Sequence, residues 1–237
     1  MAPLSLTLGY VPGATPAKWA RIWAERHADV PLELRSISVA DAVEAVRTGE
    51  VDVALLRPRA DTAGLAVISL YAETTVVVVP VDHVLTAADE ISAADLDGEP
   101  TLLPLDDVVD WAQAPGVPID HRPETTGDAI ELVAAGLGVL VVPQSLARLH
   151  HRRDLTFRPI TDAPTCPVAL VFPDGTQSEL VEEFVGVVRG RKAGSSRGQT
   201  QSAPKRTARE KAMAKQAARA AAGKVARKPG RAERGRR

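Results

Sequence analysis

Residues 130–143 read IELVAAGLGVLVVP, and this stretch decides the fold class. Four apolar residues recur with the i, i+3, i+4, i+7 spacing of one helix face: Ile130, Val133, Ala134 and Leu137. Gly136 and Gly138 end that helix, and residues 139–142 continue as an unbroken apolar strand. A helix that leads directly into a buried strand is typical of α/β proteins.

The first 75 residues also alternate between strands and helices. Strands are predicted at residues 4–10, 32–36, 51–56 and 65–70. One helix is expected to begin with Thr15 as N-cap and Pro16 in the first helical position. Another is expected to begin at Ser38, with Asp41 in the capping-box position, and to end at Gly49. This order predicts parallel strands joined by right-handed crossovers.

The rest of the folded region follows the same pattern more loosely. A strand buried on both faces is predicted at residues 76–79, because all four residues are valine. Further strands are predicted at residues 101–103, 117–122, 155–160 and 168–172. Further helices are predicted at residues 92–96, 106–114 and 178–188.

The net charge of −1 hides two regions of opposite sign. Residues 189–237 hold 17 Lys and Arg against 2 acidic residues, whereas residues 1–188 hold 12 against 28. We therefore expect an acidic folded body and a basic tail at residues 191–237. Within the tail, residues 207–222 are rich in good helix formers, and Thr207 with Glu210 forms a capping box.

No apolar run reaches the ~18 residues that span a bilayer, and no signal peptide is evident, so a cytoplasmic location is expected. Catalytic motifs are also missing: we find no nucleophile elbow, zinc-protease helix or phosphate loop. The single cysteine, Cys166, has no neighbouring base, and the adjacent His150 and His151 point apart on a helix. We expect no catalytic residue, no metal site and no cofactor.

Three loops that follow strands and precede helices carry small, hydroxyl-bearing or glycine residues. The positions chosen for a ligand site are Gly13, Ala14, Thr15, Ser36, Ser38, Thr125, Thr126 and Gly127. Backbone N–H groups at helix N-termini suit a carboxylate or another small anion, and ligands bind at the carboxyl ends of strands in open α/β sheets. The alternative is that these residues only cap their helices.

Several segments resemble the effector-binding domain of LysR-type transcriptional regulators. They are residues 6–10, 32–35 (LELR), 42–56 (AVEAVRTGEVDVALL), 77–84 (VVVPVDHV) and 130–143. The resemblance covers residues 4–190 and implies a two-lobed α/β fold like that of type 2 periplasmic binding proteins, with two crossover strands. A small effector would lie between the lobes, and the resemblance places it at the three loops named above.

The resemblance also divides the chain. It implies an effector-binding domain at residues 1–190, with lobe I at about 1–75 and 161–190 and lobe II at about 76–160. The sequence departs from the family in three places. The winged helix-turn-helix that precedes this domain is missing before Met1, so no sequence-specific DNA recognition is expected. The stretch 104–118 is shorter than usual, and Val84 follows His83 where the family has proline.

The basic tail resembles the Lys/Arg/Ala extensions of some actinobacterial nucleoid proteins. Six residues on or beside its helix-prone segment are candidates for phosphate contact: Lys205, Arg206, Arg209, Lys211, Lys215 and Arg219. No aromatic residue lies between residues 190 and 237, so we expect sequence-independent contact with DNA or RNA without base stacking. The alternative is a tail that covers the acidic body or only aids solubility.

These observations predict a non-enzymatic sensor of a small organic anion or amino-acid-like metabolite that acts in transcriptional regulation. A homodimer is expected, because Trp19, Ile22 and Trp23 give one helix more apolar bulk than a single face needs. The alternatives are an enzyme on a similar two-lobed fold and a structural nucleoid-associated protein. A folded body without an internal cavity would favour the structural role.

Overall fold

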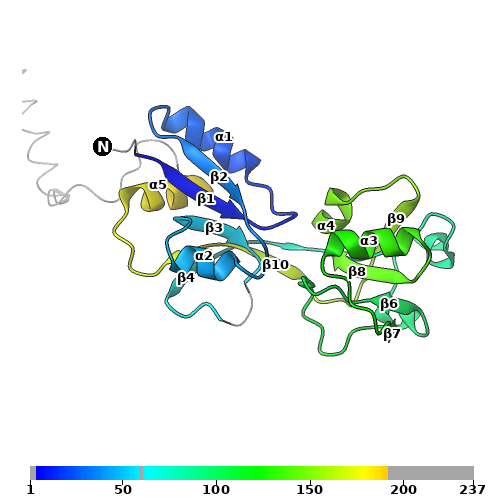
Figure 1. Cartoon of the computed structure of the whole chain (residues 1–237). Coiled ribbons are helices and arrows are strands. Elements are labelled where there is room, and N and C mark those ends of the chain that lie inside the picture. The colour runs from blue at the N-terminus through cyan, green and yellow to red at the C-terminus, as the bar shows by residue number, and fades with distance from the viewer. Residues whose placement is uncertain (1–3, 59–60, 192–237) are drawn as a thin grey trace, which may run out of the picture. The chain divides into compact units, whose positions relative to one another are not determined.

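The computed structural model describes residues 4–58 and 61–191, which form two lobes, each built on its own sheet (Figure 1). The chain separates into two units, Met1–Ala193 and Gly194–Arg237, and the second lies outside the described residues. The expected helix at 207–222 and the six basic tail residues therefore also lie outside them.

Lobe I contains a five-stranded sheet in the order β2-β1-β3-β10-β4. Its strands are β1 (Leu6–Tyr10), β2 (Leu32–Ser36), β3 (Val53–Leu56), β4 (Leu65–Glu73) and β10 (Cys166–Pro173). β1 pairs in parallel with β2 and β3, and α1 (Ala17–Arg26) and α2 (Ala42–Arg47) form the crossovers. The predicted parallel order of the first three strands is confirmed. β10 and β4 extend the sheet in antiparallel fashion.

The core of lobe I consists mainly of aliphatic residues around two aromatic side chains. Trp23 of α1 and Phe184 of α5 (Glu179–Val188) are buried with ring centroids 5.7 Å apart. The indole N–H of Trp23 donates to the carbonyl of Val30 at 2.8 Å. Trp23 is therefore a core residue, whereas Trp19 and Ile22 remain half-buried on the same helix.

Lobe II contains a second five-stranded sheet in the order β7-β6-β8-β5-β9. Its strands are β5 (Thr75–Pro80), β6 (Pro100–Leu102), β7 (Val117–Pro118), β8 (Val139–Pro143) and β9 (Leu155–Pro159). Its helices are α3 (Thr126–Ala134), α4 (Gln144–Leu149) and the short 3₁₀ turns η1 (Val84–Ala87) and η2 (Ala93–Leu96).

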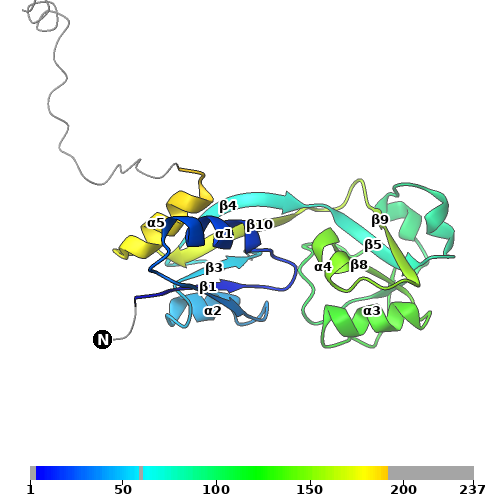
Figure 2. The ribbon, with the colours of Figure 1, turned by 90° about the horizontal axis from the view of Figure 1, so that it is seen from above.

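The central strand β5 is buried on both faces, as predicted. Val76 and Val78 pack into one cluster with α3, while Val77 and Val79 pack into another with Leu85. Figure 2 shows the two passages between the lobes, from β4 to β5 and from β9 to β10. The hydroxyl of Thr75 donates to the carbonyl of Pro164, so the two passages are joined where they run together.

The predicted helix at 106–114 is wrong, because the stretch between β6 and β7 is an irregular loop. The carboxylate of Asp107 accepts the N–H of Val109 at 3.0 Å, a local turn that competes with a helix. Trp111 then packs against the apolar cluster around Val77, which holds the loop on the lobe. The strand predicted at 117–122 is also reduced to Val117–Pro118.

Two helix starts differ from the predictions. The N-cap of α1 is Pro16 without a side-chain hydrogen bond, so Thr15 does not cap this helix. Ser38 accepts the N–H of Asp41 at 3.1 Å and donates to its carboxylate at 2.7 Å. This contact stabilises a turn before the helix, and α2 itself begins at Ala42.

Candidate functional site

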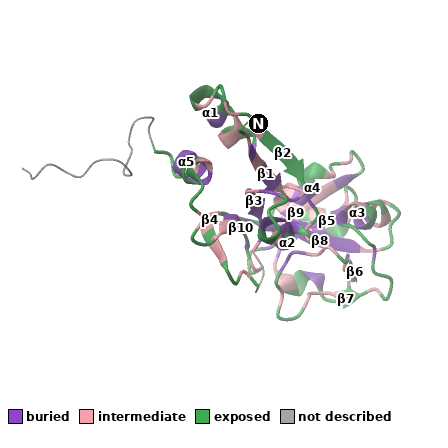
Figure 3. Ribbon diagram, turned by 60° about the vertical axis from the view of Figure 1, so that its left-hand side comes forward, coloured by how far each residue is buried: buried purple, intermediate pink, exposed green. Residues whose placement is uncertain are grey.

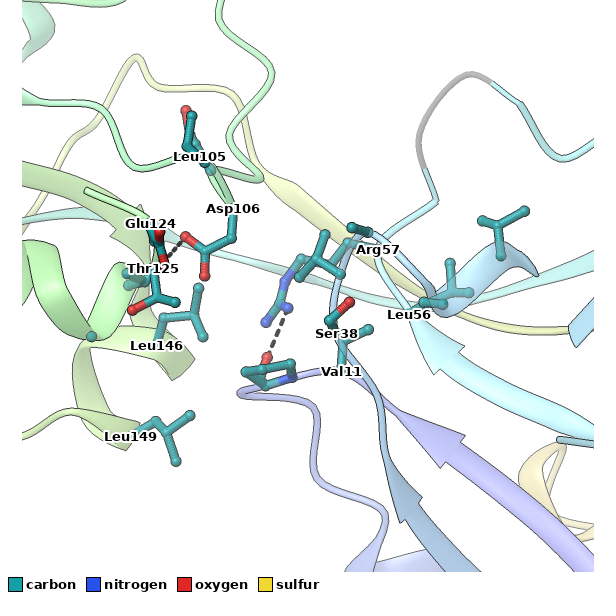
Figure 4. A pocket seen from close by; sticks show the side chains of 18 of the residues that line it. Val11, Ser38, Leu56, Arg57, Leu105, Asp106, Glu124, Thr125, Leu146 and Leu149 are labelled. Carbon is teal, nitrogen blue, oxygen red and sulfur yellow. Dashed lines mark hydrogen bonds between the residues drawn. The ribbon is translucent and has the colours of Figure 1, made fainter. Parts of the chain in front are cut away.

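A cavity of about 950 Å³ lies between the two lobes, and we call it the interlobe cavity. Lobe I contributes the ends of β1 and β3 and the start of α2, while lobe II contributes α4, the start of α3 and the 103–116 loop. Figure 4 shows side chains of both lobes around the same space. Its apolar lining comes from five labelled residues: Val11, Leu56, Leu105, Leu146 and Leu149.

Arg57, which directly follows β3, lies at the boundary of this cavity and is 5% exposed. Its Nε and Nη2 atoms lie 2.9 and 2.8 Å from Oε2 of Glu73, which is also buried. Nη1 donates to the carbonyl of Pro12 at 2.9 Å, and Nη2 donates to the hydroxyl of Ser145 on α4 at 2.9 Å. One guanidinium group therefore connects the strand ends of lobe I with a helix of lobe II.

The lobe II wall contains the N-terminus of α3. Thr125 and Asp128 form a capping box: the Thr125 hydroxyl accepts the N–H of Asp128 at 3.1 Å, and the Asp128 carboxylate accepts the N–H of Thr125 at 3.2 Å. The hydroxyl of the buried Thr126 donates to Asp106 in the neighbouring loop at 2.9 Å. Gly127 adjoins the ring of His150, since a Cβ there would lie 3.2 Å from its Cε1.

Four of the predicted ligand residues thus line the interlobe cavity: the hydroxyl-bearing Ser38, Thr125 and Thr126, and the adjacent Gly127. The structure brings these residues of the two lobes together across one space. Their hydroxyl groups, however, donate to Asp41, Asp128 and Asp106 respectively.

The other four predicted residues line a different pocket of about 700 Å³: Gly13, Ala14, Thr15 and Ser36. Gly13 has a φ of +81°, and a Cβ at this position would lie 2.6 Å from the hydroxyl of Ser145. Gly13 therefore packs against α4, while Val11 and Pro12 just before it line the interlobe cavity.

Several residues of the interlobe cavity were missed in the sequence. Arg57 carries a usable signal, because it is a charged residue directly after the buried strand 53–56. Leu105 and Asp106 carry none, since they lie just before and at the start of residues 106–114, where a helix was predicted. Leu146 and Leu149 belong to α4, a six-residue helix without a distinct sequence signal.

Charged side chains line the cavity on both lobes. Arg47 of α2 pairs with Asp61 at 3.0 Å and approaches Glu44 at 3.9 Å. The N–H of Ala63 and the Arg47 guanidinium together lower the pKa of Asp61, so this carboxylate stays ionised. Three further acidic residues lie on the lobe II side: Asp106, Asp107 and Glu124.

Cys166 is buried at the start of β10, 3.8 Å from the Thr75 hydroxyl. Burial raises the pKa of this thiol, which favours its neutral form. Within residues 4–58 and 61–191, no group of three His, Cys, Asp or Glu side chains could hold a metal ion. Across the same residues, no helix is long and apolar enough to cross a membrane.

Two solved structures illustrate the likeness of this fold to known ones. The BenM effector binding domain with its effector benzoate superposes with a TM-score of 0.67 at 18% identity, covering 80% of this chain and 92% of that one. The oxidized form of OxyR gives a TM-score of 0.66 at 21% identity, covering 80% of this chain and 96% of that one. Both likenesses support the two-lobed α/β fold.

Relatives in sequence are transcriptional regulators. The Hca operon transcriptional activator HcaR of Escherichia coli (strain K12) is 30% identical over 79% of this chain and 68% of its own length. The regulator CatR of Pseudomonas putida is 27% identical over 77% of this chain and 67% of its own length. This chain thus spans about two thirds of the length of these relatives. Residues 5–193 match the LysR substrate binding domain, and the chain therefore belongs to the LysR substrate-binding domain family.

Proposed function

We propose that the interlobe cavity binds a small-molecule effector and that the chain is a non-enzymatic sensing module of transcriptional regulation in the cytoplasm. One observation supports this most directly: the cavity of about 950 Å³ is lined by residues from both lobes. A ligand that contacts both lobes stabilises one arrangement of them, which is how binding can be transmitted to the rest of a regulator. A cavity of this size also argues against the alternative of a structural nucleoid-associated protein, for which a folded body without an internal cavity is expected.

Within this proposal we assign Ser38, Thr125, Thr126 and Gly127 to the wall of the effector site. We assign Gly13, Ala14, Thr15 and Ser36 to the wall of the second pocket, where Gly13 packs against α4. We also keep the division expected from the sequence, with residues 1–190 as the sensing domain and residues 191–237 as a basic tail. The sensing domain is proposed to form a homodimer.

The tail is proposed to contact DNA or RNA through phosphate charge. The support is its composition, since residues 189–237 hold 17 Lys and Arg against 2 acidic residues. A body with 28 acidic and 12 basic residues already carries enough charge to stay dispersed, so the tail is not needed for that purpose.

A metabolite screen tests the sensing function. A ligand at 100 times its Kd should stabilise the full chain by about 2.7 kcal/mol, which appears as a higher melting temperature. Leu146→Trp should fill the cavity and abolish that gain, while Leu137→Trp, on an exposed residue outside the cavity, should leave it unchanged. If no compound of a broad library raises the melting temperature of the unsubstituted chain or of the Leu137→Trp chain, the proposal is contradicted.

A further inference from the structure

We infer that the effector carries a positively charged amine group on an apolar skeleton. This inference rests on the proposed function, because it concerns the ligand of the same cavity. Of the two classes expected from the sequence, it disfavours the plain organic anion. Three properties of the lining support it: its cations are neutralised, its hydroxyl groups are occupied, and carboxylates remain.

Both guanidinium groups of the lining already have carboxylate partners. Arg57 shares its charge with the buried Glu73 through contacts of 2.8 and 2.9 Å, and it also donates to Pro12 and Ser145. Arg47 lies between Asp61 and Glu44. A ligand carboxylate would therefore have to replace an existing partner instead of meeting an unpaired positive charge.

The hydroxyl groups that could have bound an anion are also engaged. Ser38 donates to Asp41, Thr125 to Asp128 and Thr126 to Asp106, at 2.7, 2.7 and 2.9 Å. A hydroxyl has one hydrogen to donate, so each of these groups can offer a ligand only lone pairs. These three hydroxyl groups, which the sequence suggests as donors to an anion, therefore face a ligand as acceptors.

Carboxylates on the lobe II wall complete the argument. Asp106 binds Thr126 through Oδ1, and within residues 4–58 and 61–191 no group is paired with Glu124. Figure 4 shows Asp106 and Glu124 close to the start of α3, on the same side of the cavity. An ammonium group has three N–H donors and no acceptor, which matches carboxylate oxygens. The acidic body adds a negative field of the same sign.

The rest of the ligand should be apolar. Val11 and Leu56 approach from lobe I, and Leu105, Leu146 and Leu149 from lobe II. Pockets of this kind gain affinity from apolar contact and fix orientation with a few polar groups. An amine on an aliphatic or aromatic skeleton combines both requirements.

The first test measures the charge of the cavity without any effector. Leu105→Cys places a thiol in the lining, and Leu137→Cys places one outside it in an uncharged stretch of sequence. Each full-length chain is treated with methanethiosulfonate reagents carrying either a trimethylammonium or a sulfonate group. We expect the rate ratio of cationic to anionic reagent to be about tenfold higher at position 105. Adding Asp106→Asn and Glu124→Gln should remove most of that difference.

Equal ratios at the two positions, or a lower ratio at 105, would overturn the inference. The unsubstituted chain controls for Cys166, which is buried and should not react on the same timescale. This labelling experiment does not depend on effector binding, so a negative result would leave the proposed sensing function untouched.

The second test compares paired ligands that share one carbon skeleton, such as benzylamine with benzoate and hexylamine with hexanoate. We expect the amine of a pair to bind the full chain at least about tenfold more tightly. Glu124→Gln should weaken amine binding about three- to tenfold. Its matched control is Glu90→Gln, an exposed glutamate outside the cavity, which should change nothing. Tighter carboxylate binding that Leu146→Trp abolishes would overturn the amine class and leave the sensing function intact.

Discussion

At the scale of single residues, Arg57 and Glu73 are the most consequential pair. Among the described residues, theirs is the one ion pair in which both side chains are under 10% exposed. Removing one partner of such a pair leaves a buried charge without compensation, which costs far more than the pair contributes. We predict that Glu73→Ala lowers the free energy of unfolding by about 3–5 kcal/mol in urea denaturation.

Two variants make that result interpretable. Arg21→Ala breaks the exposed pair with Glu25 and should change the free energy of unfolding by at most about 0.5 kcal/mol. The double variant Arg57→Met with Glu73→Leu leaves no charge behind and should recover most of the loss. A Glu73→Ala chain as stable as Arg21→Ala would mean that the pair is not buried in solution.

Cys166 gives a second prediction at this scale. Burial raises the pKa of its thiol, so the reactive thiolate is disfavoured at neutral pH, and the Sγ atom is covered by Thr75 and the backbone of Val108. We expect the folded full-length chain to react with Ellman's reagent or hydrogen peroxide only as fast as it unfolds. Urea should restore ordinary thiol reactivity. A fast reaction of the native chain would instead indicate a redox-sensing role.

At the scale of elements, α1 and α3, two of the three helices that follow the predicted ligand loops, differ in how they start. Thr125 caps α3 with a hydrogen bond from the N–H of Asp128, whereas Thr15 makes no capping bond to α1. We predict that Thr125→Ala lowers the free energy of unfolding by about 1 kcal/mol. Thr15→Ala, its matched control, should stay within about 0.5 kcal/mol of the parent chain. Equal losses in thermal melts would contradict the difference seen between the two helix starts.

The elements also show how far sequence patterns predict this fold. Strands such as β5 and β8 were predicted almost to the residue, because an unbroken apolar run between turn residues has few alternatives. The helix at 178–188 was predicted from apolar residues that fall on one helix face, and Ser178 does cap α5. The helix predicted at 106–114 does not form, and the stretch is a loop in which Asp107 accepts the N–H of Val109 in a local turn.

The residues that line the interlobe cavity were only partly predictable from the sequence. The rule that ligands bind at the carboxyl ends of strands predicted Ser38 and the start of α3, because this rule depends only on the order of strands and helices. This rule could not show that Thr15 and Ser36 line a different pocket, because that depends on tertiary packing such as the contact of Gly13 with Ser145. Nor could it supply Arg57 or Asp106, whose partners are distant in sequence.

At the scale of the whole molecule, the first question is the oligomeric state. Figure 3 shows half-buried and exposed positions along α1. Trp19 and Ile22 are half-buried on this helix, whereas Trp23 is buried in the core and cannot contact a second chain. We predict a dimer that uses these two residues, so Ile22→Asp should shift the chain to monomer in sedimentation velocity at tens of micromolar. Glu25→Ala, on the same helix, should leave the dimer intact. A parent chain that sediments as a monomer would rule the dimer out.

The opposite charges of the body and the tail lead to the last prediction. If about six phosphates are neutralised by Lys205, Arg206, Arg209, Lys211, Lys215 and Arg219, the log of the association constant should fall against log salt with a slope near −5. DNA duplexes of random sequence and of one defined sequence should bind with the same affinity in fluorescence anisotropy, because phosphate contacts carry no sequence information. A chain ending at Gly190 should not bind, since its acidic body repels DNA.

Replacing the same six residues by Gln in the full chain keeps its length and should abolish most of the binding and flatten the slope. This variant separates charge from chain length, which truncation cannot do. Equal binding by the full and truncated chains would place the nucleic-acid contact on the body, against its charge. Absence of binding by both would instead favour a tail that covers the acidic body, and the truncated chain should then bind a synthetic peptide of residues 191–237, more weakly as salt rises.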